Sequence, residues 1–369
     1  MNLSRNIISS LKDKKVEFFT GVPDSLLKNF CNELQKLNKK KHVISSNEGG
    51  AVSIAAGYYL ATKKIPLVYL QNSGLGNIIN PISSIIHKEI YGIPMILFIG
   101  WRGAKNIKDE IQHKVQGKIT LDQLRLLNIK YKVFNKRSYK NQLSELIEIA
   151  KKNNQPVALI FRKGDLENNQ NKKTQNKKIN KYTMLTRSEF IDELVKNSKN
   201  FKIISTTGFT SRELYQTRML IDNTSNNDFY MVGGMGHTSM VALGYSLGSK
   251  KKTICLDGDG SFLMHMGASV ISSKFGAKNF KYILLNNLCH ESVGKQPTAI
   301  DIIDLEKFVL SIGYKKYFLI DKKVSFKKIF KKFLDCSGPS FLNVLINPNT
   351  TKNLLRIKNL QKIKRDFIN

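Results

Sequence analysis

Cysteine is scarce in this chain of 369 residues, which contains four. No two of them stand in a Cys-x-x-Cys spacing, and they are scattered from Cys31 to Cys336. Such a set excludes a disulfide scaffold and a cysteine-based zinc site. Cys255 lies in the apolar run 253–256, where a free thiol packs as a small hydrophobic side chain. The cysteine pattern therefore predicts a protein of the reducing cytoplasm.

Long hydrophobic runs are also missing. No apolar stretch approaches the ~18 residues that a membrane-spanning helix needs. Residues 1–5 lead directly into an amphipathic helix, without the apolar stretch and cleavage site of a signal peptide. We therefore expect a cytoplasmic protein that does not act at a membrane.

Acidic residues are few, because 28 Asp and Glu oppose 60 Lys and Arg, which gives a net charge of +32. Such an excess favours nucleic-acid binding. The lysines, however, are spread over the whole chain, as at 12–15, 39–41 and 151–152, and no RNP, zinc-finger or helix-turn-helix signature is present. The charge therefore indicates attraction of anionic small molecules. A basic nucleic-acid-binding protein stays as the alternative.

Short apolar segments alternate with amphipathic ones along the chain, a pattern that indicates parallel sheets covered on both faces. The segment that starts at Glu167 is strongly polar and predicts a linker over 167–184. The predicted fold class is α/β, with one parallel-sheet domain at 1–166, a second at 185–369 that ends in a basic helix, and no middle domain. The expected strands are 16–19, 42–45, 67–70, 94–99, 157–161, 201–205, 253–257, 280–285, 316–320 and 340–346, and the expected helices include 24–37, 48–62 and 262–275.

The segment Gly258, Asp259, Gly260 and Ser261 follows one predicted strand, and Asn286 with Asn287 follows the next. Because the carboxyl ends of neighbouring parallel strands lie side by side, an Asp and an Asn are expected there together, where ligands bind. One carboxylate and one amide oxygen suit a hard divalent cation that is also held by a diphosphate and water. Ser261 is expected to open a helix, whose free N–H groups favour a phosphate. The alternative is an ordinary turn and a polar strand end.

This spacing resembles the cofactor-binding motif of the thiamine-diphosphate-dependent decarboxylase superfamily. The resemblance implies thiamine diphosphate and Mg²⁺ as cofactors, and two domains that bind the pyrimidine and the diphosphate in that order. It also implies a metal site made of Asp259, Asn287 and the backbone carbonyl of Cys289. Asn286 is the competing amide, and the superfamily pattern favours Asn287.

A glutamate in the first domain, Glu48, opens the helix that contains the segments 48–51 and 55–57. Taken alone, it is an acid at a helix start, where a carboxylate is favoured. The resemblance implies that Glu48 exchanges a proton with the aminopyrimidine ring of the cofactor. In the superfamily this glutamate acts across a subunit interface, which implies a homo-oligomer, at least a dimer, with shared active sites.

Further cofactor contacts are implied in the second domain. Met235 matches the bulky apolar residue that holds the cofactor bent, and the carbonyl of Gly233 is a candidate partner of its ring amine. Thr207 and Gly208, at a strand end, are candidates to meet the diphosphate. An ordinary core position for Met235 stays as the alternative.

More specific similarity covers both domains. The segments 18–27, 71–77, 109–113, 206–214 and 285–298 are similar to the phosphonopyruvate decarboxylases. This resemblance implies a carboxy-lyase that converts phosphonopyruvate to phosphonoacetaldehyde and CO₂ without oxidation, in the biosynthesis of phosphonates of the 2-aminoethylphosphonate type. Sulfopyruvate decarboxylase is the alternative; it is commonly split into two subunits, so a single chain favours phosphonopyruvate. A carboligase of the acetolactate-synthase kind is a further alternative. That family usually has a middle domain, which is not expected in this chain.

A substrate with two anionic groups needs cationic or N–H-rich contacts beyond the cofactor. The candidates are Asp24, Ser25, Arg102 and Lys295, and the proton that replaces CO₂ could come from His113 or His290. Arg102 is equally well interpreted as a loop residue in a salt bridge, and both histidines as ordinary loop residues. Lys295 departs from the relatives, which typically have glycine there.

Overall fold

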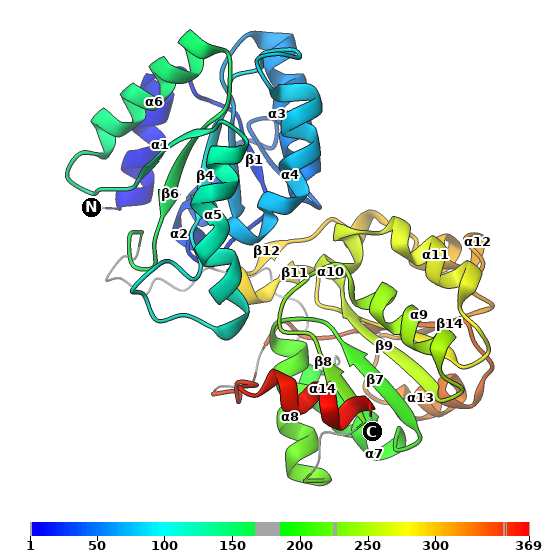
Figure 1. Cartoon of the computed structure of the whole chain (residues 1–369). Helices are drawn as coiled ribbons and strands as arrows, with labels where there is room; N and C mark the ends of the chain where they lie inside the picture. The colour runs from blue at the N-terminus through cyan, green and yellow to red at the C-terminus, as the bar shows by residue number, and fades with distance from the viewer. Residues whose placement is uncertain (1, 167–184, 224–226, 350, 352, 369) are drawn as a thin grey trace. The chain divides into compact units, whose positions relative to one another are not determined.

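The computed structural model describes residues 2–166, 185–223, 227–349, 351 and 353–368. The chain divides into two compact units, Met1–Lys173 and Thr174–Asn369, each of which is considered by itself (Figure 1). The predicted linker 167–184 lies outside the described residues. In the part of the chain that the structure describes, no helix has the length and apolar character needed to cross a bilayer.

The first unit is built on a six-stranded parallel sheet in the order β2-β1-β3-β4-β6-β5. Successive residues of the central strands are buried on opposite faces of the sheet: Ile96 and Phe98 in one core, Leu97 and Ile99 in the other. The strands are β1 (Phe19–Gly21), β2 (His42–Ile44), β3 (Leu67–Gln71), β4 (Ile96–Gly100), β5 (Lys130–Val133) and β6 (Val157–Phe161).

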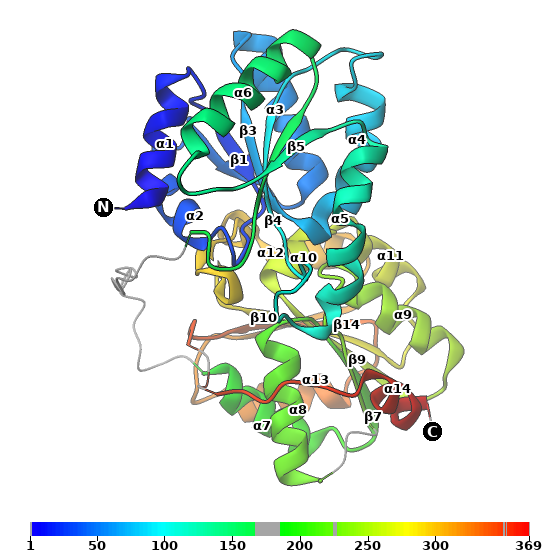
Figure 2. The same cartoon turned by 60° about the vertical axis from the view of Figure 1, so that its left-hand side comes forward.

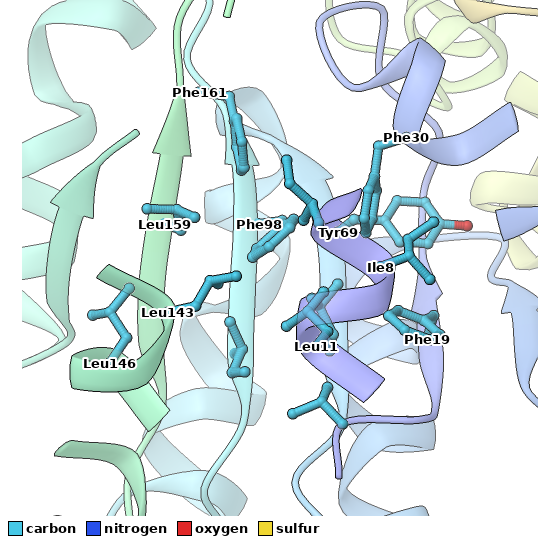
Figure 3. Packing of buried hydrophobic residues seen from close by; sticks show 14 of the residues in the cluster. Ile8, Leu11, Phe19, Phe30, Tyr69, Phe98, Leu143, Leu146, Leu159 and Phe161 are labelled. Atoms are coloured by element: carbon cyan, nitrogen blue, oxygen red, sulfur yellow. The ribbon is translucent and has the colours of Figure 1, made fainter. Parts of the chain in front are cut away.

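Helices cover both faces of this sheet, as Figure 1 shows. On one face α1 (Leu3–Asp13), α2 (Lys28–Leu34) and α6 (Tyr139–Asn153) enclose the aromatic core of Figure 3, in which Phe98 lies between Phe30 and Phe161. On the other face lie α3 (Glu48–Thr62), α4 (Leu75–Pro81) and α5 (Lys114–Leu126). The sheet is therefore buried on both sides, which explains its uninterrupted apolar strands.

The second unit repeats this architecture, with strand order β13-β14-β10-β9-β7-β8 and every pair parallel. A two-stranded antiparallel pair, β11 (Cys289–His290) and β12 (Gln296–Pro297), follows β10. The sheet strands are β7 (Phe201–Ser205), β8 (Asp228–Tyr230), β9 (Lys252–Gly258), β10 (Phe280–Asn286), β13 (Lys316–Ile320) and β14 (Ser340–Leu345).

Figure 2 shows how helices enclose the second sheet. One core contains side chains of α7 (Arg187–Asn197), α8 (Phe209–Ile221) and α13 (Phe326–Asp335). The other contains side chains of α9 (Thr238–Gly248), α10 (Asp259–Met264) and α12 (Leu305–Ser311), and α11 (Gly267–Phe275) packs beside α9. The basic tail contains α14 (Leu360–Ile368), whose Ile363 and Phe367 are buried in these cores.

The predicted fold class is confirmed: each unit has a parallel sheet between helices, and the described residues contain no middle domain. The elements that were not predicted include the edge strands β5 and β8, the short strands β11 and β12, and the helix α8. The buried face of α8 is polar, with Thr210, Glu213 and Arg218 inside, so it has no apolar stripe to recognise. The predicted helix 262–275 is two helices, α10 and α11, and the first strand begins at Phe19 rather than at residue 16.

Candidate active site

The ends of β9 and β10 bring the Gly-Asp-Gly-Ser segment and the asparagine pair together. These strands pair in parallel with Gly258 opposite Leu285, so Asp259 and Asn287 both follow the carboxyl ends of neighbouring strands. Gly258 is the N-cap of α10, and Ser261 is the third residue of this helix rather than its first. The site therefore lies at the sheet edge where ligands bind in such folds.

Asp259 is a buried carboxyl group. Its Oδ1 accepts the Gly260 N–H at 2.9 Å, and its Oδ2 accepts the Thr298 hydroxyl at 2.9 Å. Burial raises the pKa of Asp259 to about 7, although these bonds and the Leu288 N–H favour the charged form. A buried carboxylate of this kind is stabilised by a nearby cation.

The turn after β10 offers neutral oxygens beside Asp259. The Asn287 Oδ1 accepts the Cys289 N–H at 3.2 Å, and its Nδ2 donates to Glu291 at 3.0 Å. Cys289 lies two residues further along this turn, opposite Pro297 in the β11–β12 pair, and its backbone carbonyl is the third oxygen of the predicted set. Carboxylate, amide and carbonyl oxygens are the donor set that Mg²⁺ prefers, so these residues fit the expected metal. Among the described residues, no group of three or more His, Cys, Asp or Glu side chains is placed to hold a metal ion.

Ser261 joins the loops around this edge. Its hydroxyl accepts the Gly236 N–H at 3.0 Å and the Thr206 hydroxyl at 3.1 Å. Gly208, at φ +91°, precedes α8 and lies close to Ser292. These two bonds connect three segments: the loop that contains Gly233 and Met235, the end of β7 and the first turn of α10. Thr207 and Gly208 follow the end of β7.

Gly260 brings Met235 and His290 together. A Cβ on Gly260 would lie 2.7 Å from the His290 ring and 3.2 Å from the Met235 Cε. Burial lowers the pKa of His290 to about 4, so its ring is neutral at neutral pH. Both predicted residues therefore lie over the first turn of α10, where only glycine leaves room for them.

In the first unit, Glu48 begins α3 directly after the N-cap Asn47, whose side chain accepts the Gly50 N–H at 2.7 Å. The Glu48 carboxyl is buried, and burial raises its pKa, which the hydrogen bond from Asn77 partly offsets. The Asn77 Nδ2 donates to Oε2 at 2.7 Å. A Cβ on Gly74 would lie 2.3 Å from Oε1. The segment 71–77 therefore makes room for this carboxyl and orients it.

The predicted substrate residues of the first unit also lie together. Arg102 pairs with Asp109 through Nε at 2.8 Å and Nη2 at 2.6 Å, and its Nη1 donates to the Ser25 hydroxyl at 2.9 Å. The salt bridge expected in the alternative interpretation of Arg102 is therefore present. Asp109 was part of a motif without an assigned role, and its charge neutralises the guanidinium.

Asp24 lies next to this pair and is fully buried against Gly100. Its Oδ2 accepts the N–H groups of Leu26 and Leu27, while its Oδ1 has no hydrogen-bond partner among the described residues. Burial raises the pKa of Asp24 to about 6, against the opposing charge of Arg102. An unpartnered buried carboxyl oxygen of this kind is typical of a functional site.

His113 and Lys295 have different settings. Burial and the charge of Arg102 lower the pKa of His113, whose backbone carbonyl lies against Gly103. Lys295, in the second unit, donates from Nζ to the Pro348 carbonyl at 2.6 Å and has φ +61°. This left-handed backbone is one that glycine adopts without steric cost, so Lys295 occupies a conformation that side chains rarely take.

Arg187 is the site residue that the sequence did not reveal. It is buried and pairs with Glu291 and Glu213 beside the Asn287 amide. The only sequence signal here is the capping box of Thr186 and Glu189, which predicts a helix start and not a buried cation.

Two family models match this chain. The N-terminal domain that binds thiamine pyrophosphate, another name for thiamine diphosphate, matches residues 1–126, and the C-terminal domain that binds it matches residues 206–344. These are the two units that carry Glu48 and Asp259 respectively.

Curated relatives extend over nearly the whole chain. A phosphonopyruvate decarboxylase of Streptomyces viridochromogenes is 27% identical over 96% of this chain and 90% of its own length. A sulfopyruvate decarboxylase of Methanosarcina acetivorans is 28% identical over 95% of this chain and 93% of its own. The sulfopyruvate decarboxylase subunit beta of Methanothermobacter thermautotrophicus is 34% identical over 45% of this chain and 84% of its own length. The chain therefore belongs to the thiamine-diphosphate-dependent enzymes and is a carboxy-lyase of the 2-oxo acid decarboxylase kind.

Proposed function

We propose that this enzyme decarboxylates phosphonopyruvate to phosphonoacetaldehyde, with Mg²⁺ as the metal that binds together with thiamine diphosphate. The observation that carries the proposal is the nearly full-length similarity to phosphonopyruvate decarboxylases from two Streptomyces species. The single chain does not by itself argue against sulfopyruvate, because the Methanosarcina sulfopyruvate decarboxylase is matched over 93% of its length. Sulfopyruvate therefore stays the second candidate substrate.

The chain's own residues then have distinct tasks. Asp259, Asn287 and the Cys289 carbonyl hold Mg²⁺, while Gly258, Ser261, Thr207 and Gly208 line the diphosphate site. Gly233 and Met235 hold the aminopyrimidine side, and Glu48 holds and releases a proton there. When bound, thiamine diphosphate accepts the electron pair that is released as CO₂ leaves.

The substrate contacts come from Asp24, Ser25 and Arg102. Arg102 uses three of the five N–H groups of a guanidinium on Asp109 and Ser25, so donors remain for an oxyanion. Lys295 is a second candidate cation, since one bond to Pro348 leaves part of its ammonium available. One proton replaces the lost CO₂ in the product, and His113 and His290 are the candidates to supply it.

A homo-oligomer with shared active sites is part of the proposal. Apolar side chains exposed on α3 in the first unit, and on the adjacent helices α9 and α11 in the second, support it, because exposed apolar surface is typical of interaction sites. These side chains are Ile54, Leu60, Val241, Leu247, Val270, Ile271 and Phe275. We further propose a cytoplasmic role in phosphonate biosynthesis, without nucleic-acid or membrane partners.

The test is CO₂ release from phosphonopyruvate, sulfopyruvate and pyruvate in parallel, each with and without thiamine diphosphate and Mg²⁺. Cofactor-dependent turnover that is fastest with phosphonopyruvate supports the proposal. Faster turnover of sulfopyruvate would keep the chemistry and replace the substrate. No release from any of the three by protein that binds the cofactor would overturn the decarboxylase assignment for these substrates.

A further inference from the structure

Arg187 is fixed at the start of α7 in the second unit. The Thr186 hydroxyl accepts the Glu189 N–H at 3.2 Å, and the Thr186 N–H donates to the Glu189 carboxylate at 2.9 Å. This capping box determines where the helix begins, and Arg187 is its first residue. Its side chain is 4% exposed, so Arg187 is a buried cation. Because the capping box fixes the backbone at this residue, it also fixes the point from which the side chain extends.

Two buried carboxylates share this guanidinium. Arg187 Nη2 pairs with Glu291 Oε2, and Nη1 lies 3.7 Å from Glu213 Oε2. The ring of Phe209 lies 5.8 Å from the guanidinium carbon. Because a buried charge requires paired partners, Arg187 holds Glu291 in one place.

Glu291 in turn determines which end of the Asn287 amide faces away from it. The oxygen of Glu291 that pairs with Arg187 also accepts the Asn287 Nδ2 at 3.0 Å. The Oδ1 of Asn287 is therefore turned to the opposite side, toward the Cys289 N–H. An amide oxygen has two lone pairs, so one remains for a cation. A flipped amide would present its donor end instead, which cannot bind a cation.

We propose that Arg187 and Glu291 are positioning residues that orient Asn287 Oδ1 as a ligand of the divalent cation. Partners that orient metal ligands in this way typically change metal affinity by about 10-fold to 100-fold when they are removed. The inference rests on the proposed metal site at Asp259 and Asn287. Sequence spacing alone did not indicate it, because Arg187 lies far from residues 287–291 in the chain.

The experiment measures Mn²⁺ affinity by EPR in the full chain at saturating thiamine diphosphate. We expect Glu291→Ala to weaken Mn²⁺ binding by about 10-fold to 100-fold and to alter the spectrum of the bound ion. Glu291→Gln keeps an oxygen that can accept from both Arg187 and Asn287, so it should restore most of the affinity. Arg187→Lys should lie between these two, because an ammonium lacks the planar fork with which Arg187 pairs with Glu291 and Glu213 from separate nitrogens.

Glu213→Gln is the matched control. It removes the other carboxylate charge beside Arg187 without touching the Asn287 amide, and we expect an unchanged spectrum. If Glu213→Gln and Glu291→Gln weaken binding as much as Glu291→Ala, the effect is one of charge, and the positioning role is overturned. Should Glu291→Ala fail to fold, the EPR spectra of Mn²⁺ bound to Glu291→Gln and to Arg187→Lys still test the positioning role.

Asn287→Ala separates this inference from the metal site on which it rests. If Asn287→Ala weakens Mn²⁺ binding and Glu291→Ala does not, the site stands and the positioning role fails. If Asn287→Ala has no effect, the proposed ligand itself is wrong, and the inference fails with it.

Discussion

Two buried carboxyl groups with proposed roles, Glu48 in one unit and Asp259 in the other, have different neighbours. Glu48 in the first unit and Asp259 in the second are 5% and 4% exposed, and burial raises the pKa of both. Glu48 receives a hydrogen bond from the neutral Asn77 amide. Asp259 lies beside a turn that offers the oxygens of Asn287 and Cys289. Similar burial thus suits a proton in one unit and a divalent cation in the other.

The comparison teaches that the donors and acceptors around a buried carboxyl group decide its chemistry, whereas burial alone does not. An amide donor tolerates both protonation states of Glu48, which a group that exchanges a proton requires. The neutral oxygens of Asn287 and Cys289 favour a cation next to Asp259. The predictions below test this distinction from the largest expected effect to the smallest.

The largest effect is expected for Asp259→Ala. We expect loss of Mg²⁺-dependent retention of thiamine diphosphate and no measurable turnover, because the only acidic ligand of the proposed metal set is removed. Gel filtration with cofactor quantification, with and without Mg²⁺, checks this. Retention equal to that of the unsubstituted chain would mean that the metal lies elsewhere.

Glu48→Gln should also lose turnover, but unlike Asp259→Ala it should keep the cofactor. The amide fills the same space, so cofactor retention is expected to persist while turnover falls by about 10²-fold to 10⁴-fold, the range for removal of a general acid–base. Steady-state rates and cofactor titration on the same preparations check this. Full turnover would end the proton-exchange role of Glu48.

Gly74→Ala should disturb Glu48 without touching its chemistry. The added Cβ would lie 2.3 Å from the Glu48 Oε1, so the carboxyl must move, and we expect turnover to fall by up to about 10²-fold. Gly76→Ala is the control in the same segment, since a Cβ there meets nothing within 4 Å. Equal losses in both variants would show that a general disturbance of the segment 71–77, and not a shift of the Glu48 carboxyl, lowers the turnover.

The smallest effect concerns stability without metal. Burial raises the pKa of Asp259 from 3.8 to about 7, so between these values the folded state binds more protons than the unfolded state. The free energy of unfolding of the metal-free protein should therefore fall as the pH rises from about 4 to about 7. Denaturant unfolding at several pH values checks the slope. Asp259→Asn should flatten it, and an unchanged slope in that variant would assign the effect to another group, such as Asp24.

Much of the fold followed from local pattern. Apolar strands of four to seven residues between amphipathic helices predicted both sheets, because strands buried on both faces need continuous apolar sequence. The edge strand β5 (Lys130–Val133) was not predicted, since Lys130 and Lys132 interrupt its apolar residues and no position in it is fully buried. Helix α8 was not predicted because its buried face carries polar side chains, whose partners lie on other segments: Glu213 accepts from Thr351 in the tail, and Arg218 pairs with Asp228.

The residue types of the candidate site were also readable in the sequence, and their partners were not. Asp24, Ser25 and Arg102 were expected near the substrate, but the pairing of Arg102 with Asp109 appears only in the folded unit. The same holds for the contact of His290 and Met235 over Gly260. Such contacts join distant segments, and no local spacing encodes them.

The sequence by itself determined the α/β class, because strand patterning is a local property of the chain, and the resemblance carried by the spacing of Asp259 and Asn287 implied the cofactor and the order of the two domains. Only the tertiary structure decided how each polar group is satisfied. It placed Gly74 and Asn77 against Glu48, and the buried Arg187 behind Glu291. The physical reason is that burial and hydrogen bonding depend on which segments meet in space, and a buried polar group must find its partner there.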